Sequence, residues 1–223
     1  MKRTIGFFGD SFCASRYSWS FSYKTYTSML SDHYNAKIVN LGTGGSSIGD
    51  LILLQLKPFI QKNKVPDICV FVWTDPGRLF HRTIRNLNYT SVQTNTERSK
   101  VWDSARDYFT YLNDWEFLEL QYVALLEHVD NNVLPKLPTK TKIVHLWSFG
   151  KPKEWNTAGF NANNLEYYYT WKNGVEVRPS LMSVCMMDNP LDDIFNDTAP
   201  NHLSNKLKNE IVFNYIKSAI DIQ

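Results

Sequence analysis

The chain has 223 residues, with 24 basic and 22 acidic side chains and a formal net charge of +2. This length is enough to bury one α/β core and does not require a second. The charges are interspersed and form no basic stripe, so nucleic acid is not an expected partner. The three cysteines (Cys13, Cys69 and Cys185) lie far apart, which indicates a reducing compartment and argues against a disulfide framework or a zinc site.

Targeting segments are not recognisable in the sequence. Two basic residues at positions 2 and 3 precede an apolar run of five residues, which is too short for the core of a signal peptide. No segment approaches the ~20 apolar residues of a membrane span. We therefore expect a soluble, cytoplasmic protein that does not interact with membranes.

Short apolar runs alternate with helical patterns along the chain. Strands are expected at residues 4–8, 36–41, 67–73 and 142–147. Helices are expected at residues 19–30, 48–60, 102–129 and 205–220, with residues 79–96 a loop. This alternation predicts a single-domain α/β protein, a three-layer α/β/α sandwich on a parallel sheet of about five strands.

Two stretches depart from the alternation. Residues 98–131 carry a helical insertion, and residues 165–178 indicate a hairpin closed by an Asn-Gly turn at residues 173–174. The aromatic run at residues 167–171 is either part of that packed hairpin or a platform for a sugar. Residues 181–187 are a candidate fifth strand.

The last helix has an apolar face of its own. Ser204 is a plausible N-cap. The residues expected on its buried side recur at helical spacing and are Leu207, Ile211, Tyr215 and Ala219.

Ser11 follows the first strand directly, in the sequence Gly9-Asp10-Ser11. A serine on a strand-to-helix turn has its hydroxyl lifted off the end of the sheet, beside backbone N–H groups near the positive end of a helix dipole. This geometry suits a nucleophile whose attack generates an oxyanion. The alternative is a Gly-Asp turn followed by an ordinary capping serine.

Further polar loops follow the other strands. The sequence GTGGSS occupies residues 42–47 and TDPGR occupies residues 74–78, each directly after a strand. A loop before the last helix contains Asp197 and His202. Because the carboxyl ends of parallel strands meet at one edge of a sheet, we expect these loops to gather around Ser11.

In the order of these blocks, the chain resembles the SGNH (GDSL-type) hydrolases, which are esterases and deacylases with a flavodoxin-like sheet. The resemblance spans nearly the whole chain in four short blocks. It implies that Ser11 is the nucleophile, His202 the general base and Asp197 the group that orients the histidine. It also implies an oxyanion hole made of the N–H groups of Ser11 and Gly45, with Gly44 as the alternative to Gly45.

The chain departs from the family pattern at two positions. Thr74 occupies the place of the usual asparagine of the oxyanion hole and could donate only through its shorter hydroxyl. The acid usually lies three residues before the histidine, where this chain has Ala199, and Asp197 lies five before it. A Ser-His dyad oriented by a backbone carbonyl is therefore an alternative to the triad.

Other chemistry-bearing residues have plainer interpretations. Asp10, Asp75 and Arg78 are possible substrate-binding residues, although Arg78 could equally pair with Asp75. Cys13 is a second candidate nucleophile near the turn, and His145, within a strand, is expected in the core. The loop at residues 42–49 lacks both the dinucleotide fingerprint and a P-loop lysine.

The resulting expectation is a serine hydrolase that cleaves a carboxylic ester through an acyl-enzyme on Ser11. The substrate would be a small-molecule or glycan ester, such as an O-acylated carbohydrate, and no metal or organic cofactor is expected. An O-acyltransferase that uses the same serine is one alternative. A non-catalytic binding protein that retains the fold is another, favoured by the two departures at Thr74 and Asp197.

Overall fold

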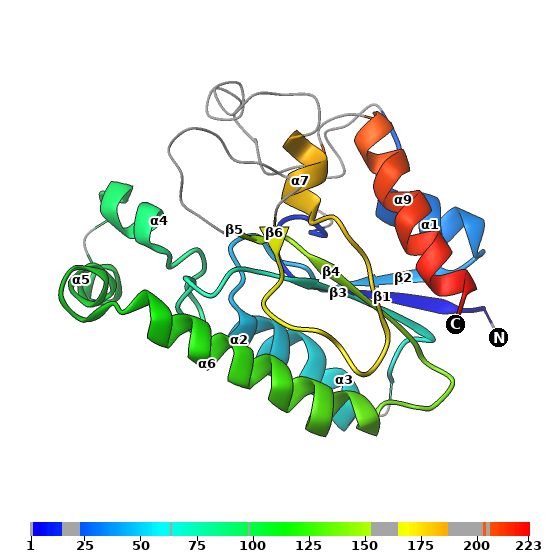
Figure 1. Cartoon of the computed structure of the whole chain (residues 1–223), viewed down its shortest axis with the longest axis horizontal. Coiled ribbons are helices and arrows are strands. Elements are labelled where there is room, and N and C mark those ends of the chain that lie inside the picture. Colours follow the sequence, from blue (N-terminus) through cyan, green and yellow to red (C-terminus); the bar gives the residue numbers. More distant parts are fainter. Residues whose placement is uncertain are drawn as a thin grey trace.

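The structure is a computed structural model, and it describes residues 2–14, 23–62, 64–97, 99–152, 165–186, 203 and 206–223. No helix among these residues is long and apolar enough to cross a membrane. Strands and helices form three layers, with a twisted sheet in the middle (Figure 1).

The central sheet has five strands, all parallel, in the order β2-β1-β3-β4-β7. Its strands are β1 (Thr4–Phe8), β2 (Lys37–Asn40), β3 (Ile68–Trp73), β4 (Lys142–Trp147) and β7 (Val175–Glu176). Four of them match the predicted strands within two residues. The predicted fold class, a three-layer sandwich on a parallel sheet, is confirmed.

β3 is the central strand of the sheet, and all six of its residues are buried. Its side chains alternate between two cores: Val70 and Val72 pack on one face, while Phe71 and Trp73 pack on the other. A strand that is apolar on both faces needs helices on both sides of the sheet, which is the usual environment of a parallel strand.

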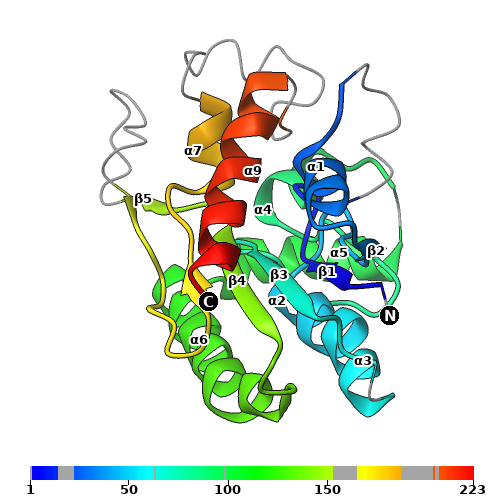
Figure 2. The same ribbon diagram turned by 90° about the vertical axis from the view of Figure 1, so that its right-hand side faces the viewer.

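Helices cover each face (Figures 1 and 2). One face carries α1 (Tyr26–His33), α7 (Leu181–Met186) and α9 (Lys206–Asp221). The other carries α2 (Ile48–Asp50), the π-helix η2 (Leu51–Leu56), α3 (Lys57–Gln61), α6 (Trp115–His128), the π-helix η4 (Val129–Val133) and the 3₁₀-helix η5 (Leu134–Lys136).

The long helix expected at residues 102–129 is two helices. They are α5 (Lys100–Asp107), continued by the π-helix η3 (Tyr108–Leu112), and α6. Asn113 is extended, and the Asp114 side chain accepts from the Phe117 N–H to start α6 as an N-cap. The expected loop at residues 79–96 contains a short helix, α4 (Tyr89–Thr94), which packs with α5 and η3 around Val92, Trp102 and Phe109. Residues 100–112 and 115–133 are therefore helical, and the description of segment 98–131 as an insertion stays a prediction.

The hairpin expected at residues 165–178 is wrong. β6 (Leu165–Glu166) pairs antiparallel with β5 (Lys151–Pro152), whereas β7 joins the main sheet beside β4. The physical reason is Asp130, whose carboxylate accepts the backbone N–H groups of Lys172 at 2.8 Å and Asn173 at 3.1 Å. These bonds hold the Asn-Gly turn against η4 and leave β7 free to pair with β4.

The candidate strand at residues 181–187 is also wrong, because residues 181–186 form α7. Ser180 precedes the helix, and its hydroxyl accepts from the Ser183 N–H at 3.2 Å. A serine that caps a first helical turn stabilises helix over strand.

The buried face of α9 differs from the expected one. Leu207 and Tyr215 are exposed, while the buried residues of the helix are Lys208, Asn209, Val212, Ile216, Ala219 and Ile220. Asn209 fixes this rotation because its side-chain oxygen accepts from the Tyr26 N–H at 2.9 Å. The spacing of apolar residues cannot predict that an asparagine or a lysine lies on the buried face of a helix. Ser204, the expected N-cap, lies outside the described residues.

His145 is a core residue, as expected. Its Nδ1 accepts from the indole N–H of Trp73 at 3.0 Å, and its Nε2 lies 2.7 Å from the carbonyl oxygen of Asn173, to which it donates. The ring stacks on Trp171, with 3.9 Å between centroids. Trp171 is therefore buried in the core, and not exposed for sugar stacking. Burial lowers the pKa of His145 to about 3.

This lowered pKa predicts a pH-dependent stability. Below about pH 6.5 the unfolded chain binds a proton at His145 that the folded protein does not bind, so the free energy of unfolding should fall as the pH drops towards 3. His145→Gln removes this contribution, and its slope should be shallower by up to about 1.4 kcal/mol per pH unit. Urea unfolding between pH 4.5 and 6.5 measures both slopes, and equal slopes would contradict the assignment.

Candidate active site

Three loops converge where neighbouring strands end. β2, β1 and β3 are adjacent and parallel, so the loops that follow them lie at one edge of the sheet. Hydrogen bonds join these loops directly: the Thr43 N–H donates to the Gly9 carbonyl at 3.1 Å, and Arg78 Nη1 donates to the Ser46 carbonyl at 3.3 Å. The predicted gathering of these loops is therefore present.

Ser11 lies on a tight turn at the end of β1. Gly9 has φ of +154°, and a Cβ at this position would lie 2.5 Å from the carbonyl oxygen of Val72, so only glycine fits beside β3. The N–H of Cys13 donates to the Asp10 carbonyl, and that of Ala14 donates to the Ser11 carbonyl, both at 3.3 Å. Ser11 itself is half-buried. A turn, and not yet a helix, thus follows it.

The helix expected at residues 19–30 appears only in part. α1 begins at Tyr26, with the Thr25 side chain as its N-cap, and residues 15–22 lie outside the described part of the chain. The described backbone therefore places no helix N-terminus directly behind Ser11.

Gln55 holds this turn in place and was not identified from the sequence. Its side chain is buried; its oxygen accepts from the Gly9 N–H at 2.6 Å and its amide donates to the Gly9 carbonyl at 2.9 Å. The amide also lies 3.2 Å from the Ser46 hydroxyl. Gln55 belongs to the π-helix η2, a conformation that is frequent at functional sites. A single glutamine within an apolar helix gives no sequence signal for this role.

Asn40 connects the first two loops from the end of β2. Its side-chain nitrogen donates to the Cys13 carbonyl, and its oxygen accepts from the Gly42 N–H at 2.9 Å. A Cβ on Gly42 would lie 2.4 Å from the Cys13 sulfur, so the two loops touch through this glycine. Asn40 begins the sequence Asn-Leu-Gly-Thr-Gly-Gly at residues 40–45, and this bridge explains its position.

Two N–H groups of the loop at residues 42–47 find no acceptor among the described residues. Its other N–H groups donate to groups of the protein, and they belong to Gly42, Thr43, Ser46 and Ser47. Those of Gly44 and Gly45 donate to no described group, and neither does the N–H of Ser11. Gly45 has φ of +73° and its carbonyl accepts from the Asn86 N–H at 2.9 Å, which fixes the peptide. Unpaired N–H groups on a fixed backbone are the donors that an oxyanion needs.

Thr74 lies at the end of β3, at the same edge of the sheet. It is buried, and its hydroxyl has no hydrogen-bond partner among the described residues. Ser148, its neighbour at the end of β4, also has a buried hydroxyl without a described partner. The role of Thr74 as an oxyanion donor stays a prediction.

Arg78 is buried among the loops, with a side chain that is 7% exposed. Its Nη1 lies 3.6 Å from Asp10 Oδ2 and its Nε lies 3.7 Å from Asp75 Oδ2. Burial raises the pKa of Asp75, while Arg78 and the Gly77 N–H oppose that rise. The pairing of Arg78 with Asp75 is thus present, together with a second pairing to Asp10. A role of these three residues in binding substrate stays a prediction.

Cys13 is unsuited to act as the nucleophile. It is buried, and this burial raises the pKa of its thiol well above the usual value, with the Asp10 carboxylate as a smaller cause. A thiol whose pKa is raised is not a thiolate at neutral pH, and the thiolate is the reactive form.

His202 and Asp197 lie outside the described residues, so their roles stay predictions. Within the described part of the chain, no three His, Cys, Asp or Glu side chains form a group that could hold a metal ion.

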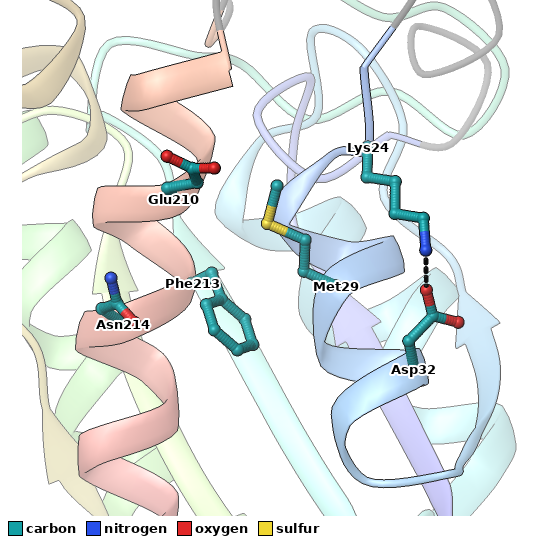
Figure 3. A pocket seen from close by; sticks show the side chains of 6 residues that line it. All are labelled: Lys24, Met29, Asp32, Glu210, Phe213 and Asn214. Atoms are coloured by element: carbon teal, nitrogen blue, oxygen red, sulfur yellow. Dashed lines mark hydrogen bonds and ion pairs between the residues drawn. The ribbon is translucent and has the colours of Figure 1, made fainter.

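A hollow of about 390 Å³ between α1 and α9 is lined by Met29 and Phe213 among others (Figure 3). Another of about 610 Å³ lies beside Tyr89 and Phe109. Neither is lined by a predicted catalytic residue.

Comparisons with known proteins establish the architecture. No family model matches the chain, and no curated protein matches it. Among solved structures, LAE5, an α/β hydrolase enzyme from the metagenome of Lake Arreo, Spain, matches with a TM-score of 0.51 and 11% identity, over 99% of this chain and 97% of that one.

Two further solved structures align over similar lengths. The psychrotrophic esterase EstA from a Pseudoalteromonas species has a TM-score of 0.48 and 11% identity, over 99% of this chain and 98% of that one. A GDSL-like lipase from Parabacteroides merdae has a TM-score of 0.47 and 16% identity, over 100% of this chain and 98% of that one. At these identities the likeness to LAE5 concerns the α/β fold alone, and the resemblance to the SGNH hydrolases rests on the sequence motifs.

Proposed function

We propose that this protein is a carboxylic-ester hydrolase of the SGNH type, acting through an acyl-enzyme on Ser11. The observation that carries the proposal is that the N–H groups of Ser11, Gly44 and Gly45 donate to no group in the described part of the chain. They occur on two loops that are joined by the hydrogen bond from the Thr43 N–H to the Gly9 carbonyl, at the edge of the sheet where Ser11 lies. Backbone donors left free in this way stabilise negative charge on a substrate oxygen.

The mechanism follows from these groups. The Ser11 hydroxyl attacks the acyl carbon while His202 takes its proton, and the carbonyl oxygen of the ester becomes an oxyanion held by the N–H groups of Ser11 and Gly45. His202 returns the proton to the leaving alcohol. Water then attacks the acyl-enzyme with His202 again as base, which releases the acid and free Ser11. Asp197 orients His202 and stabilises its imidazolium.

The substrate is a small-molecule or glycan ester. Transfer of the acyl group to an acceptor alcohol would use the same first half-reaction and differ only in the second.

Ser11→Ala should abolish labelling by a fluorophosphonate probe and the turnover of p-nitrophenyl acetate, because the nucleophile is lost. The thermal midpoint should stay nearly unchanged, since Ser11 is half-buried and its hydroxyl packs in no core. Gel fluorescence and a spectrophotometric assay measure both activities. Retained activity in Ser11→Ala would exclude Ser11 as the nucleophile. An unlabelled wild-type protein would instead indicate a binding protein that keeps the fold.

Asp197→Asn tests the choice between a triad and a dyad. If Asp197 orients His202, kcat should fall by up to about 10⁴-fold, because the amide favours the wrong tautomer and stabilises the imidazolium less. His202→Ala sets the scale for loss of the base. A loss below about tenfold in Asp197→Asn, with a much larger loss in His202→Ala, would mean that a backbone carbonyl orients the histidine.

Thr74→Val tests whether the threonine hydroxyl has replaced the usual asparagine. Valine keeps the shape and removes an unpaired buried hydroxyl, so the thermal midpoint should hold or rise. A donor to the oxyanion acts mainly in the transition state, so kcat should fall while KM changes little. Ser148→Ala, which removes the neighbouring unpaired hydroxyl, is the matched control. An unchanged kcat in Thr74→Val would leave the oxyanion to the backbone N–H groups alone.

A further inference from the structure

A buried carboxylate, that of Asp10, lies next to the proposed nucleophile in the sequence. Asp10 precedes Ser11 and is completely buried. Its Oδ1 accepts from the Phe12 N–H at 3.1 Å, while its Oδ2 has no hydrogen-bond partner among the described residues. A buried carboxylate at this position opposes negative charge on a neighbouring oxyanion, and the low dielectric of the interior strengthens that repulsion.

Arg78 is the cation that faces this carboxylate. Its Nη1 lies 3.6 Å from Asp10 Oδ2, and its Nε has no hydrogen-bond partner among the described residues. The contact with Asp10 is longer than a hydrogen bond, so charge compensation and not bond geometry links the two side chains. The guanidinium carbon also lies 5.4 Å from the centre of the Phe149 ring, two residues after the end of β4.

Arg78 has a second contact that reaches the oxyanion loop. Its Nη1 donates to the carbonyl of Ser46 at 3.3 Å, one residue after Gly45. Gln55 holds the Ser46 hydroxyl from the other side, at 3.2 Å. Ser46, the residue after Gly45, is therefore held at its carbonyl by Arg78 and at its hydroxyl by Gln55, and Arg78 is the one that also compensates Asp10.

We propose that Arg78 is a positioning residue of this active site: it neutralises Asp10 beside Ser11 and fixes the loop that presents the Gly45 N–H. This inference rests on the proposed function, since it assigns a role within that reaction. Arg78 is buried and engaged by two carboxylates and a carbonyl, so it acts through Asp10 and Ser46 and does not clamp the substrate.

The test removes the two charges separately and together. Arg78→Met leaves Asp10 uncompensated, and kcat for p-nitrophenyl acetate should fall by about 10- to 100-fold, with KM changed less than about threefold. Asp10→Asn keeps the Oδ1 acceptor for the Phe12 N–H and removes the charge. The double variant Asp10→Asn/Arg78→Met should therefore recover at least about a third of the kcat of Asp10→Asn.

Recovery of kcat in the double variant, relative to Arg78→Met, distinguishes charge compensation by Arg78 from a purely structural role. If Arg78 only held the loops together, the double variant would be no more active than Arg78→Met, and that result would overturn the inference. An Arg78→Met variant with the kcat of the wild type would overturn it as well. Arg106→Met removes another partly buried arginine, which pairs with Asp103 at 2.9 Å and holds the Asn95 carbonyl, and it should change stability without a selective loss of kcat.

Two further variants keep the test decisive. If Arg78→Met fails to fold, Arg78→Lys takes its place, because it retains the charge without the guanidinium fork. Its kcat should fall less, relative to the wild type, than the kcat of the double variant falls relative to Asp10→Asn. The double variant removes the charge at Asp10, so only Asp75, whose side chain is 28% exposed, loses its pairing with Arg78, and the variant should fold. Ser11→Ala is run in the same assay: if it keeps turnover, the proposed function fails, whereas Ser11-dependent turnover without suppression refutes the role of Arg78 alone.

Discussion

The parallel arrangement of the sheet is the constraint on which the rest of the structure depends. Because β2, β1, β3 and β4 all run in one direction, the loops that follow them meet at a single edge. Chain segments far apart in the sequence must pack there without a regular ladder to pair their backbone groups, and each unpaired buried group is costly. The identity of the residues in this region follows from that requirement.

Buried polar side chains meet most of this requirement. Gln55 pairs both backbone groups of Gly9, Asn40 links the Cys13 carbonyl to the Gly42 N–H, and Arg78 binds the Ser46 carbonyl. The groups that remain unpaired among the described residues include the N–H groups of Gly44 and Gly45. Most backbone groups of this loop are paired, but two adjacent N–H donors are not. The unpaired donors lower the stability of the loop and are available to a ligand.

The opposite part of the sheet is built from a different polar centre. Asp130 binds the backbone of Lys172 and Asn173, and the Asn173 carbonyl in turn accepts from His145. These contacts bring β7 alongside β4 and complete the fifth strand. The core of this layer therefore depends on a buried histidine that is neutral, and its stability is sensitive to acid.

The sequence alone determined the elements whose signal is local. Strands β1 and β3 are continuous apolar runs, and Gly9, Gly42 and Gly45 occupy positions where a Cβ would clash, so the fold class and the position of Ser11 were predictable. The tertiary structure decided the partners of Arg78, the role of Gln55, the rotation of α9 and the pairing of β7. Each of these depends on a polar contact between residues far apart in the chain, such as Asn209 with Tyr26 or Asp130 with Asn173. Apolar periodicity carries no information about such contacts, because their free energy arises only when burial removes both partners from water.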